Sequence, residues 1–264
     1  MDIIGYFASV FIGILLGLIG GGGSILTVPV LVYLFGLDTI LSTTYSLFVV
    51  GTTSLVGSVF YFKRGQVDRI TVLAFGIPSI AMVFFTRRFI VPAIPEHLFQ
   101  INSFDITKSI LFMLLFALLM IAAAYSMIKK QETSSVPVTK GKPNYIFLIL
   151  QGLFVGIVTG VVGAGGGFLI IPALVNFLKL PMKTAVGTSL VIIAINSLTG
   201  FLFSLHGTEI EWKFLGIITL FAITGIFIGM ALSKKINGKR LKPIFGWFVL
   251  VMGVFIVIKE LFLT

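Results

Sequence analysis

The stretch 17-GLIGGGGSILTVPVL-31 decides how this chain folds, because four consecutive glycines interrupt a long apolar segment there. A second stretch with the same layout, 160-GVVGAGGGFLIIPAL-174, begins 143 residues later. Glycine runs destabilise a helix, whereas proline is tolerated near a helix start. Each stretch therefore predicts a helix, a glycine-rich turn and a short second helix, with the helices expected at about 3–19 and 24–36, and at 145–162 and 167–178.

The two stretches belong to an internal repeat with a fixed offset of 143 residues. Twelve identical pairs in one register are not easily accidental, even where glycine is common. The pairs are Gly13/Gly156, Gly17/Gly160, Gly20/Gly163, Gly22/Gly165, Gly23/Gly166, Pro29/Pro172, Leu31/Leu174, Ser46/Ser189, Leu47/Leu190, Ser54/Ser197, Gly57/Gly200 and Phe60/Phe203. We therefore expect a first repeat at 1–128, a polar cytoplasmic linker at 129–144 and a second repeat at 145–264.

The composition excludes an ordinary soluble domain. Hydrophobic residues make up 58% of the 264 residues, charged residues only 11%, and the mean hydropathy is +1.15. Stretches without charged residues mostly match the roughly 20 residues that cross a bilayer; they are 3–37, 39–62, 70–86, 109–128, 143–178, 184–208, 214–233 and 243–258. The predicted fold class is an all-α polytopic membrane protein, in which each repeat has a glycine-broken first segment and three further transmembrane helices.

The number of segments in each repeat decides whether the two copies are parallel or inverted. Counting each short second helix gives five segments per copy, and an odd number inverts the second copy. With five segments, 14 of the 19 Lys and Arg residues fall on one side, whereas four segments divide them 10 to 9. Because positive loops face the cytoplasm, the count favours an inverted repeat with both termini outside.

The two glycine turns, 20–23 and 163–167, are the first candidate binding elements. In an inverted repeat they enter from opposite faces and approach each other, and the helix that follows each turn offers unpaired N–H groups to an anion. Polar residues seven apart on the following helices share a face and could complete the site. The expected substrate-binding residues are Gly20, Gly21, Gly22, Gly23, Ser24, Ser46, Thr53, Gly163, Gly165, Gly166, Gly167, Thr188, Ser189 and Asn196.

Helix packing is the alternative interpretation of these small and polar residues. Ser, Thr and Asn often form hydrogen bonds between membrane helices, so each of them has this second explanation. Glycines four residues apart let two helices approach closely. Packing is the favoured interpretation for one set, which consists of Gly13, Gly17, Gly156 and Gly160.

Catalysis and metal binding find no support in the sequence. The only histidines are His97 and His206, cysteine is absent, and no serine has a plausible base beside it. No ionisable residue is expected deep in the bilayer, since Asp38, Lys179 and Lys183 lie at segment ends. We therefore expect no enzymatic activity, no catalytic residue, no metal site and no cofactor.

The two quoted motifs, each followed by a segment of Gly-Thr-Ser type, resemble the sulfite exporter TauE/SafE family. These segments are GTSL at 187–190 and the diverged TTYSL at 43–47, and the resemblance extends over essentially the whole chain, including the GxxxG at 225–229 and the basic loop at 234–242. The resemblance implies passage of sulfite, sulfonates and related sulfur-containing anions across the cytoplasmic membrane.

We therefore expect an alternating-access transporter, a permease or exporter of small inorganic or organic sulfur anions such as sulfite, in the cell membrane. The expected partners are the lipid bilayer and the anion, and a homodimer stays open; nucleic acid is not expected, because the net charge of +10 lies in short loops. Two alternatives stay open. One is a cation-coupled or channel-like carrier of another small solute, and the other is a non-transporting membrane scaffold or assembly protein.

Overall fold

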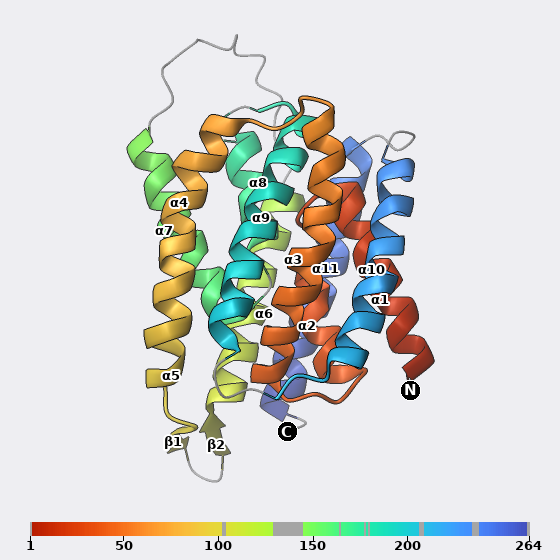
Figure 1. Ribbon diagram of the computed structural model, residues 1–264. Coiled ribbons are helices and arrows are strands. Elements are labelled where there is room, and N and C mark those ends of the chain that lie inside the picture. Colours follow the sequence, from red (N-terminus) through yellow and green to blue (C-terminus); the bar gives the residue numbers. More distant parts are fainter. Residues whose placement is uncertain are drawn as a thin grey trace.

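The computed structural model describes residues 2–101, 104–128, 145–163, 165–176, 178, 180–205, 209–233 and 238–262. Most of these residues are helical, and one short antiparallel hairpin precedes α6 (Figure 1). The elements are α1 (Asp2–Ile19), α2 (Ser24–Tyr33), α3 (Thr39–Lys63), α4 (Arg69–Phe85), the π-helical turn η1 (Thr86–Ile90), α5 (Val91–Ala93), β1 (His97–Ile101), β2 (Phe104–Thr107), α6 (Lys108–Ile128), α7 (Tyr145–Val162), α8 (Gly167–Asn176), α9 (Met182–Ser204), α10 (Trp212–Leu232) and α11 (Gly238–Phe262).

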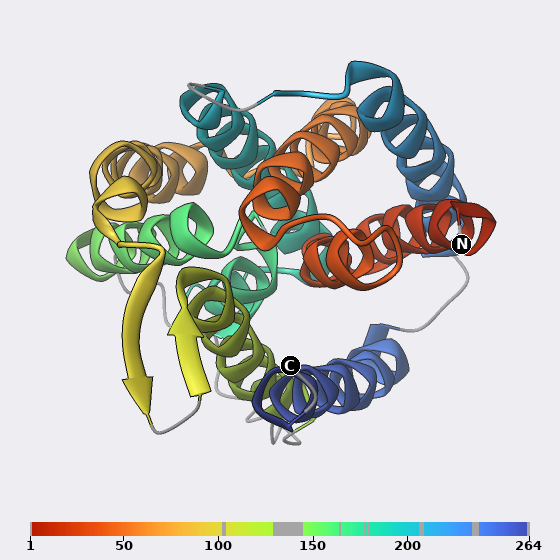
Figure 2. The ribbon, with the colours of Figure 1, turned by 90° about the horizontal axis from the view of Figure 1, so that it is seen from below.

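The helix packing repeats when the two halves are exchanged. The offset of 143 matches α1, α2, α3 and α4 with α7, α8, α9 and α10, and α6 and α11 are the last helices of the two halves. Helix α1 packs along α10 as α7 packs along α4, while α3 packs on α9 and α6 packs on α11. Seen from below, α6 and α11 lie side by side along one edge of the bundle (Figure 2). The repeated sequence therefore forms a repeated arrangement of helices.

Matched helices run in opposite directions along the bundle in Figure 1. Helix α1 begins at the lower end, beside the label N, whereas α7 begins at the upper end; α3 rises and α9 descends. Helix α11 ends at the lower end, beside the label C. The end of α3 and the starts of α4 and α9 lie at the upper end, and by sequence these helix ends include Lys63, Arg69 and Lys183, three of the 14 basic residues that the count placed on one side. The orientation of the repeats in a bilayer stays a prediction.

The outer surface of the bundle is apolar, as a lipid-facing surface requires. Side chains such as Phe7, Leu118, Ile146 and Leu220 are more than half exposed. Within the described residues, five helices are long and apolar enough to span a bilayer: 39–63, 69–93, 108–125, 182–204 and 212–233. The chain is an all-α polytopic membrane protein.

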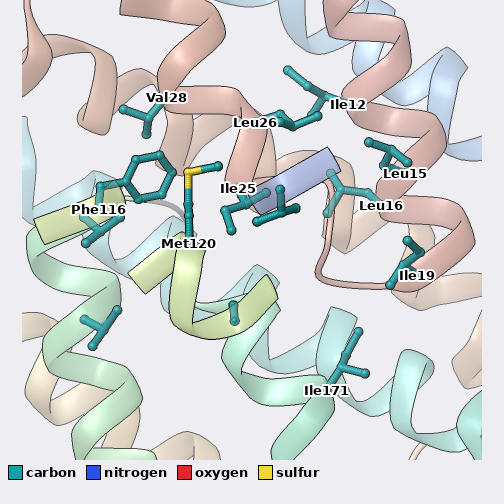
Figure 3. Packing of buried hydrophobic residues seen from close by; sticks show 14 of the residues in the cluster. Ile12, Leu15, Leu16, Ile19, Ile25, Leu26, Val28, Phe116, Met120 and Ile171 are labelled. Carbon is teal, nitrogen blue, oxygen red and sulfur yellow. The ribbon is translucent and has the colours of Figure 1, made fainter. Parts of the chain in front are cut away.

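The short helix α2 lies inside the bundle and positions the first glycine turn. Figure 3 shows Ile25 of α2 between side chains of α1, such as Leu16, and side chains of α6, such as Met120. These three side chains are fully buried. Apolar packing on several sides therefore fixes where α2 begins.

Glycines let helices from the two halves approach to backbone contact. A Cβ atom on Gly13 of α1 would overlap the carbonyl oxygen of Ala222 in α10, and one on Gly156 of α7 would overlap that of Ser79 in α4. Gly17 faces α10 at Ile226, and Gly160 faces Thr86 of η1, the turn that continues α4. The packing interpretation of Gly13, Gly17, Gly156 and Gly160 is confirmed.

A matched pair of hydrogen bonds fixes the start of α4 and the loop before α10. The hydroxyl of Thr188 in α9 accepts the backbone N–H of Asp68 at 2.9 Å. The hydroxyl of Tyr45 in α3 accepts the backbone N–H of Glu211 at 2.8 Å. The offset of 143 relates Tyr45 to Thr188 and Asp68 to Glu211, so the same hydrogen bond occurs in both halves.

The structure corrects three details of the sequence analysis. Helix α2 ends at Tyr33 instead of residue 36, because Gly36 adopts a left-handed φ of 69° that closes the helix end. Helix α8 ends at Asn176 instead of 178. Pro29 lies in the second turn of α2, where it removes a helix hydrogen bond. The predicted linker at 129–144 lies outside the described residues.

Candidate functional site

The two glycine turns meet inside the bundle. A Cβ atom on Gly167 would lie 2.6 Å from the Cα of Gly21, and a Cβ atom on Gly21 would overlap the backbone of Gly167. Both residues are buried, and α2 also contacts α8. Only glycine permits this backbone contact, which explains why the sequence keeps several small residues in a row at each turn.

Left-handed glycines turn the chain sharply at both places, and one pair of them is matched between the repeats. Gly20 and Gly163 have φ values of 82° and 73°, and Gly165 and Gly166 have 66° and 65°. A Cβ atom on Gly20 would lie 3.0 Å from the Ser189 hydroxyl oxygen of α9. Residues other than glycine adopt this left-handed conformation only with strain. The sharp turn keeps each glycine stretch close to the long helix that follows in the other repeat.

Within the described residues, several backbone N–H groups at both turns donate no backbone hydrogen bond. Two close hydrogen bonds shape the first turn, from the Gly20 N–H to the Leu16 carbonyl and from the Ser24 hydroxyl to the Gly21 carbonyl, both at 2.8 Å. Six glycines donate no backbone hydrogen bond to any described residue: Gly21, Gly22, Gly23, Gly165, Gly166 and Gly167. Buried N–H groups without partners are rare in folded proteins. These six N–H groups are therefore the candidate donors for a ligand at the turns.

The polar side chains of α3 and α9 add further groups without partners. The hydroxyls of Ser46, Thr53, Ser54 and Ser197 are buried and have no hydrogen-bond partner among the described residues. A Cβ atom on Gly165 would lie 2.8 Å from the Ser197 hydroxyl oxygen, so this hydroxyl borders the second turn. Sequence analysis predicted Ser46 and Thr53 and omitted the matched pair Ser54 and Ser197, although the repeat itself had marked that pair.

Three other predicted residues already have hydrogen bonds within the protein. Asn196 donates from Nδ2 to the Ser79 hydroxyl at 2.6 Å, and its Oδ1 has no described partner. Ser189 donates to the Val186 carbonyl at 2.9 Å. Thr188 binds the N–H of Asp68, which places its hydroxyl at the start of α4 and not at the turns. All fourteen predicted residues are buried.

Sequence analysis missed a buried cation. Arg87, in the π-helical turn η1, is only 5% exposed, whereas the next residue, Arg88, is exposed. Its Nη1 donates to the Thr43 hydroxyl at 3.3 Å, and Nε and Nη2 have no described partner. Sequence analysis named no ionisable residue inside the bundle, so the burial of Arg87 is a feature that it did not predict. The repeat offers the signal that could have found it, since the offset of 143 maps Arg87 onto Met230, inside α10.

The chemistry of these groups favours an anion. Backbone N–H groups and a guanidinium only donate, and the described part of the chain supplies no carboxylate to Arg87. A buried cation without a counter-charge attracts a negative ligand strongly because little water screens it. Among the described residues, no group of three or more His, Asp or Glu side chains could hold a metal ion.

Comparison with known proteins gives the family. Residues 6–256 match the model of the family described as "Sulfite exporter TauE/SafE". The probable membrane transporter protein YunE of Bacillus subtilis is 27% identical over 260 residues, which cover 93% of each chain. A probable membrane transporter protein of Methanocaldococcus jannaschii is 28% identical over 263 residues, covering 94% of this chain and 92% of its own. Comparison with solved structures finds no match. The chain, a membrane transporter, belongs to the sulfite exporter TauE/SafE family.

Proposed function

We propose that this transporter moves a small sulfur-containing anion, such as sulfite or an organosulfonate, across the cell membrane. The family description names sulfite, and the relatives' names add only that they are probable membrane transporters. The inverted repeat is part of the proposal, with the linker side in the cytoplasm. In this arrangement the two turns reach the centre of the protein from opposite faces.

The observation that carries this proposal is that the two turns meet, with glycine N–H groups that donate no backbone hydrogen bond within the described residues. Gly21 and Gly167 lie in backbone contact, and helices α2 and α8 begin at this place. The start of a helix carries partial positive charge and free donors, which suit an oxyanion. Several moderate donors bind the anion without holding it permanently, so release to the other side stays fast.

The burial of the site supports alternating access. Every predicted binding residue is buried, so an anion reaches the turns only after some helices separate. The repeat divides the bundle into matched contacts, α1 with α10 and α4 with α7. We propose that each contact opens on one face of the membrane, since related repeats commonly exchange conformations in such transporters.

Flux through proteoliposomes tests the proposal. Purified protein is reconstituted, and uptake of sulfite, sulfate, thiosulfate and a sulfonate is measured with and without a pH gradient. Vesicles without protein provide the background. We expect saturable uptake of at least one sulfur anion. If no anion of the panel moves while the protein is folded and correctly inserted, the transport of sulfur anions is contradicted and the scaffold alternative gains support.

A matched pair of valine variants tests the role of the turns. Gly165→Val places a β-branched side chain on a backbone with φ of 66°, beside the Ser197 hydroxyl. Gly216→Val is the control, because a Cβ atom on Gly216 of α10 meets nothing within 4 Å. We expect uptake to fall only in Gly165→Val. Equal uptake by both variants would contradict the placement of the site at the turns.

A further inference from the structure

We infer that Arg87 binds the substrate anion directly at the second glycine turn, which makes the site charged on the side of one repeat and neutral on the side of the other. This inference rests on the proposed function. It goes beyond that function because it assigns a charged binding residue and breaks the equivalence of the two turns.

The surroundings of Arg87 connect it to the second turn. The guanidinium donates to the Thr43 hydroxyl, and a Cβ atom on Gly163 would overlap the Cβ of Thr43. Thr86 packs against Gly160, and Thr159 packs against Gly166. The hydroxyls of Thr86 and Thr159 are buried and have no described partner. Arg87 and three threonines therefore surround the end of α7 and the turn that follows it.

At the first turn, the four positions matched to Arg87 and the three threonines carry no polar side chain. The offset of 143 relates Arg87 to Met230, Thr43 to Val186, Thr159 to Leu16 and Thr86 to Gly229. These residues occupy the equivalent places: Val186 lies against Gly20, Leu16 against Gly23, and the backbone of Met230 and Gly229 against Gly17. The side chains of Met230, Val186 and Leu16 are all buried.

This comparison shows that the fold does not require the cation. The same packing position holds Met230 in the second repeat, where a neutral side chain fills the space. A buried charge without a partner destabilises a protein, and a charge inside a membrane protein most often serves binding or transport. The side chain of Arg87 is therefore explained by a ligand and not by packing.

The free atoms of Arg87 have the geometry that an oxyanion needs. Nε and Nη2 share one edge of the guanidinium, and both have no described partner. The opposite nitrogen, Nη1, is the one that holds the Thr43 hydroxyl. Two parallel N–H groups on one edge bind two oxygens of a planar or pyramidal oxyanion, whereas Lys offers a single point charge.

Uptake kinetics of three variants test the inference with sulfite as the probe. Arg87→Met introduces the side chain found at the matched position, Met230. Arg87→Lys keeps the positive charge but lacks the two parallel N–H groups of the Nε–Nη2 edge. Arg88→Met is the control at an exposed position. We expect KM to rise roughly 10- to 100-fold in Arg87→Met, the effect of losing charged hydrogen bonds. Arg87→Lys should give an intermediate KM, and Arg88→Met should keep the wild-type value.

Thermal stability separates a binding role from a structural one. Without sulfite, Arg87→Met should melt at the wild-type temperature or above it, because a costly buried charge is gone. A fixed concentration of sulfite near the wild-type KM should raise the melting temperature of the wild type clearly more than that of Arg87→Met. A lower melting temperature without sulfite, with an unchanged KM, would show a structural role and overturn the inference.

The outcomes distinguish this inference from the proposed function. If the wild type transports sulfite and Arg87→Met has the same KM, Arg87 does not bind the anion and the proposed function stands. If the wild type neither transports nor is stabilised by sulfite, sulfate, thiosulfate or a sulfonate, the proposed function fails and the inference fails with it. If Arg87→Met does not fold, the KM of Arg87→Lys decides alone, and a wild-type value overturns the inference.

Discussion

Replacing Gly21 by alanine should separate the two glycine turns. Gly21 does not adopt a left-handed φ, so alanine brings no backbone strain and acts only through its Cβ. That Cβ would lie 2.6 Å from the Cα of Gly167, and ordinary contact begins at 3.4 Å, so the turns must part by at least 0.8 Å (3.4 − 2.6). The obstacle is backbone, which cannot rotate away as a flexible side chain can.

This overpacking should cost about 1–3 kcal/mol of stability. For a chain of this size the melting temperature should fall by roughly 2–12 °C. Uptake of sulfite should fall further, up to roughly 100-fold, because a displacement near 1 Å misplaces the donors. Gly76→Ala is the control, since a Cβ atom on Gly76 of α4 meets nothing within 4 Å, and alanine favours a helix.

Two measurements on the same preparations check this prediction. Melting of the detergent-solubilised protein is followed by the loss of its monodisperse chromatographic peak, and uptake is followed in proteoliposomes. The reasoning is refuted if Gly21→Ala melts and transports like Gly76→Ala. A loss of stability with full uptake would show that the contact between the turns stabilises the fold but does not form part of the anion site.

Three other predictions concern separate parts of the molecule. Ser197→Ala removes a buried hydroxyl without a described partner, so stability should hold or rise, and the KM for sulfite should rise roughly 2- to 10-fold; a lower melting temperature with unchanged KM would contradict this. Tyr45→Phe leaves the N–H of Glu211 without its acceptor, so it should cost about 1–3 kcal/mol in thermal unfolding and leave KM unchanged, whereas a raised KM would place Tyr45 in the site. Lys183→Cys and Glu209→Cys each add a single thiol to a chain without cysteine. An impermeant maleimide should label position 209 from outside intact cells and position 183 only after permeabilisation. Labelling of both positions from the same side would overturn the inverted arrangement.

The fold could largely be predicted from the sequence because two strong local signals agree with one another. Consecutive glycines break a helix wherever they lie in lipid, and both broken segments were located to within three residues. The fixed offset then predicted matched helices, which the repeated packing of α1 on α10 and α7 on α4 bears out. Glycine spacing also predicted close helix packing, since glycines without a Cβ let two membrane helices approach closely.

The site was harder to predict because its decisive features are non-local. Arg87 follows a charge-free run and precedes Arg88, so it resembled the end of a membrane span, and only the packing of η1 shows that it is buried. Thr188 shared a polar segment with Ser189, but its hydroxyl meets a loop 120 residues away. Hydropathy alone cannot distinguish a hydroxyl that caps a loop from one that faces a ligand.

The most direct test of the central claim is the position of a bound anion. Crystals of the purified protein grown with selenite, a heavier analogue of sulfite, would show selenium by its anomalous scattering. We predict one main peak between the two glycine turns, within hydrogen-bond distance of the second turn and of the Nε–Nη2 edge of Arg87. Selenium found only at the surface, in protein that transports selenite, would contradict the assignment of the glycine turns as the anion site.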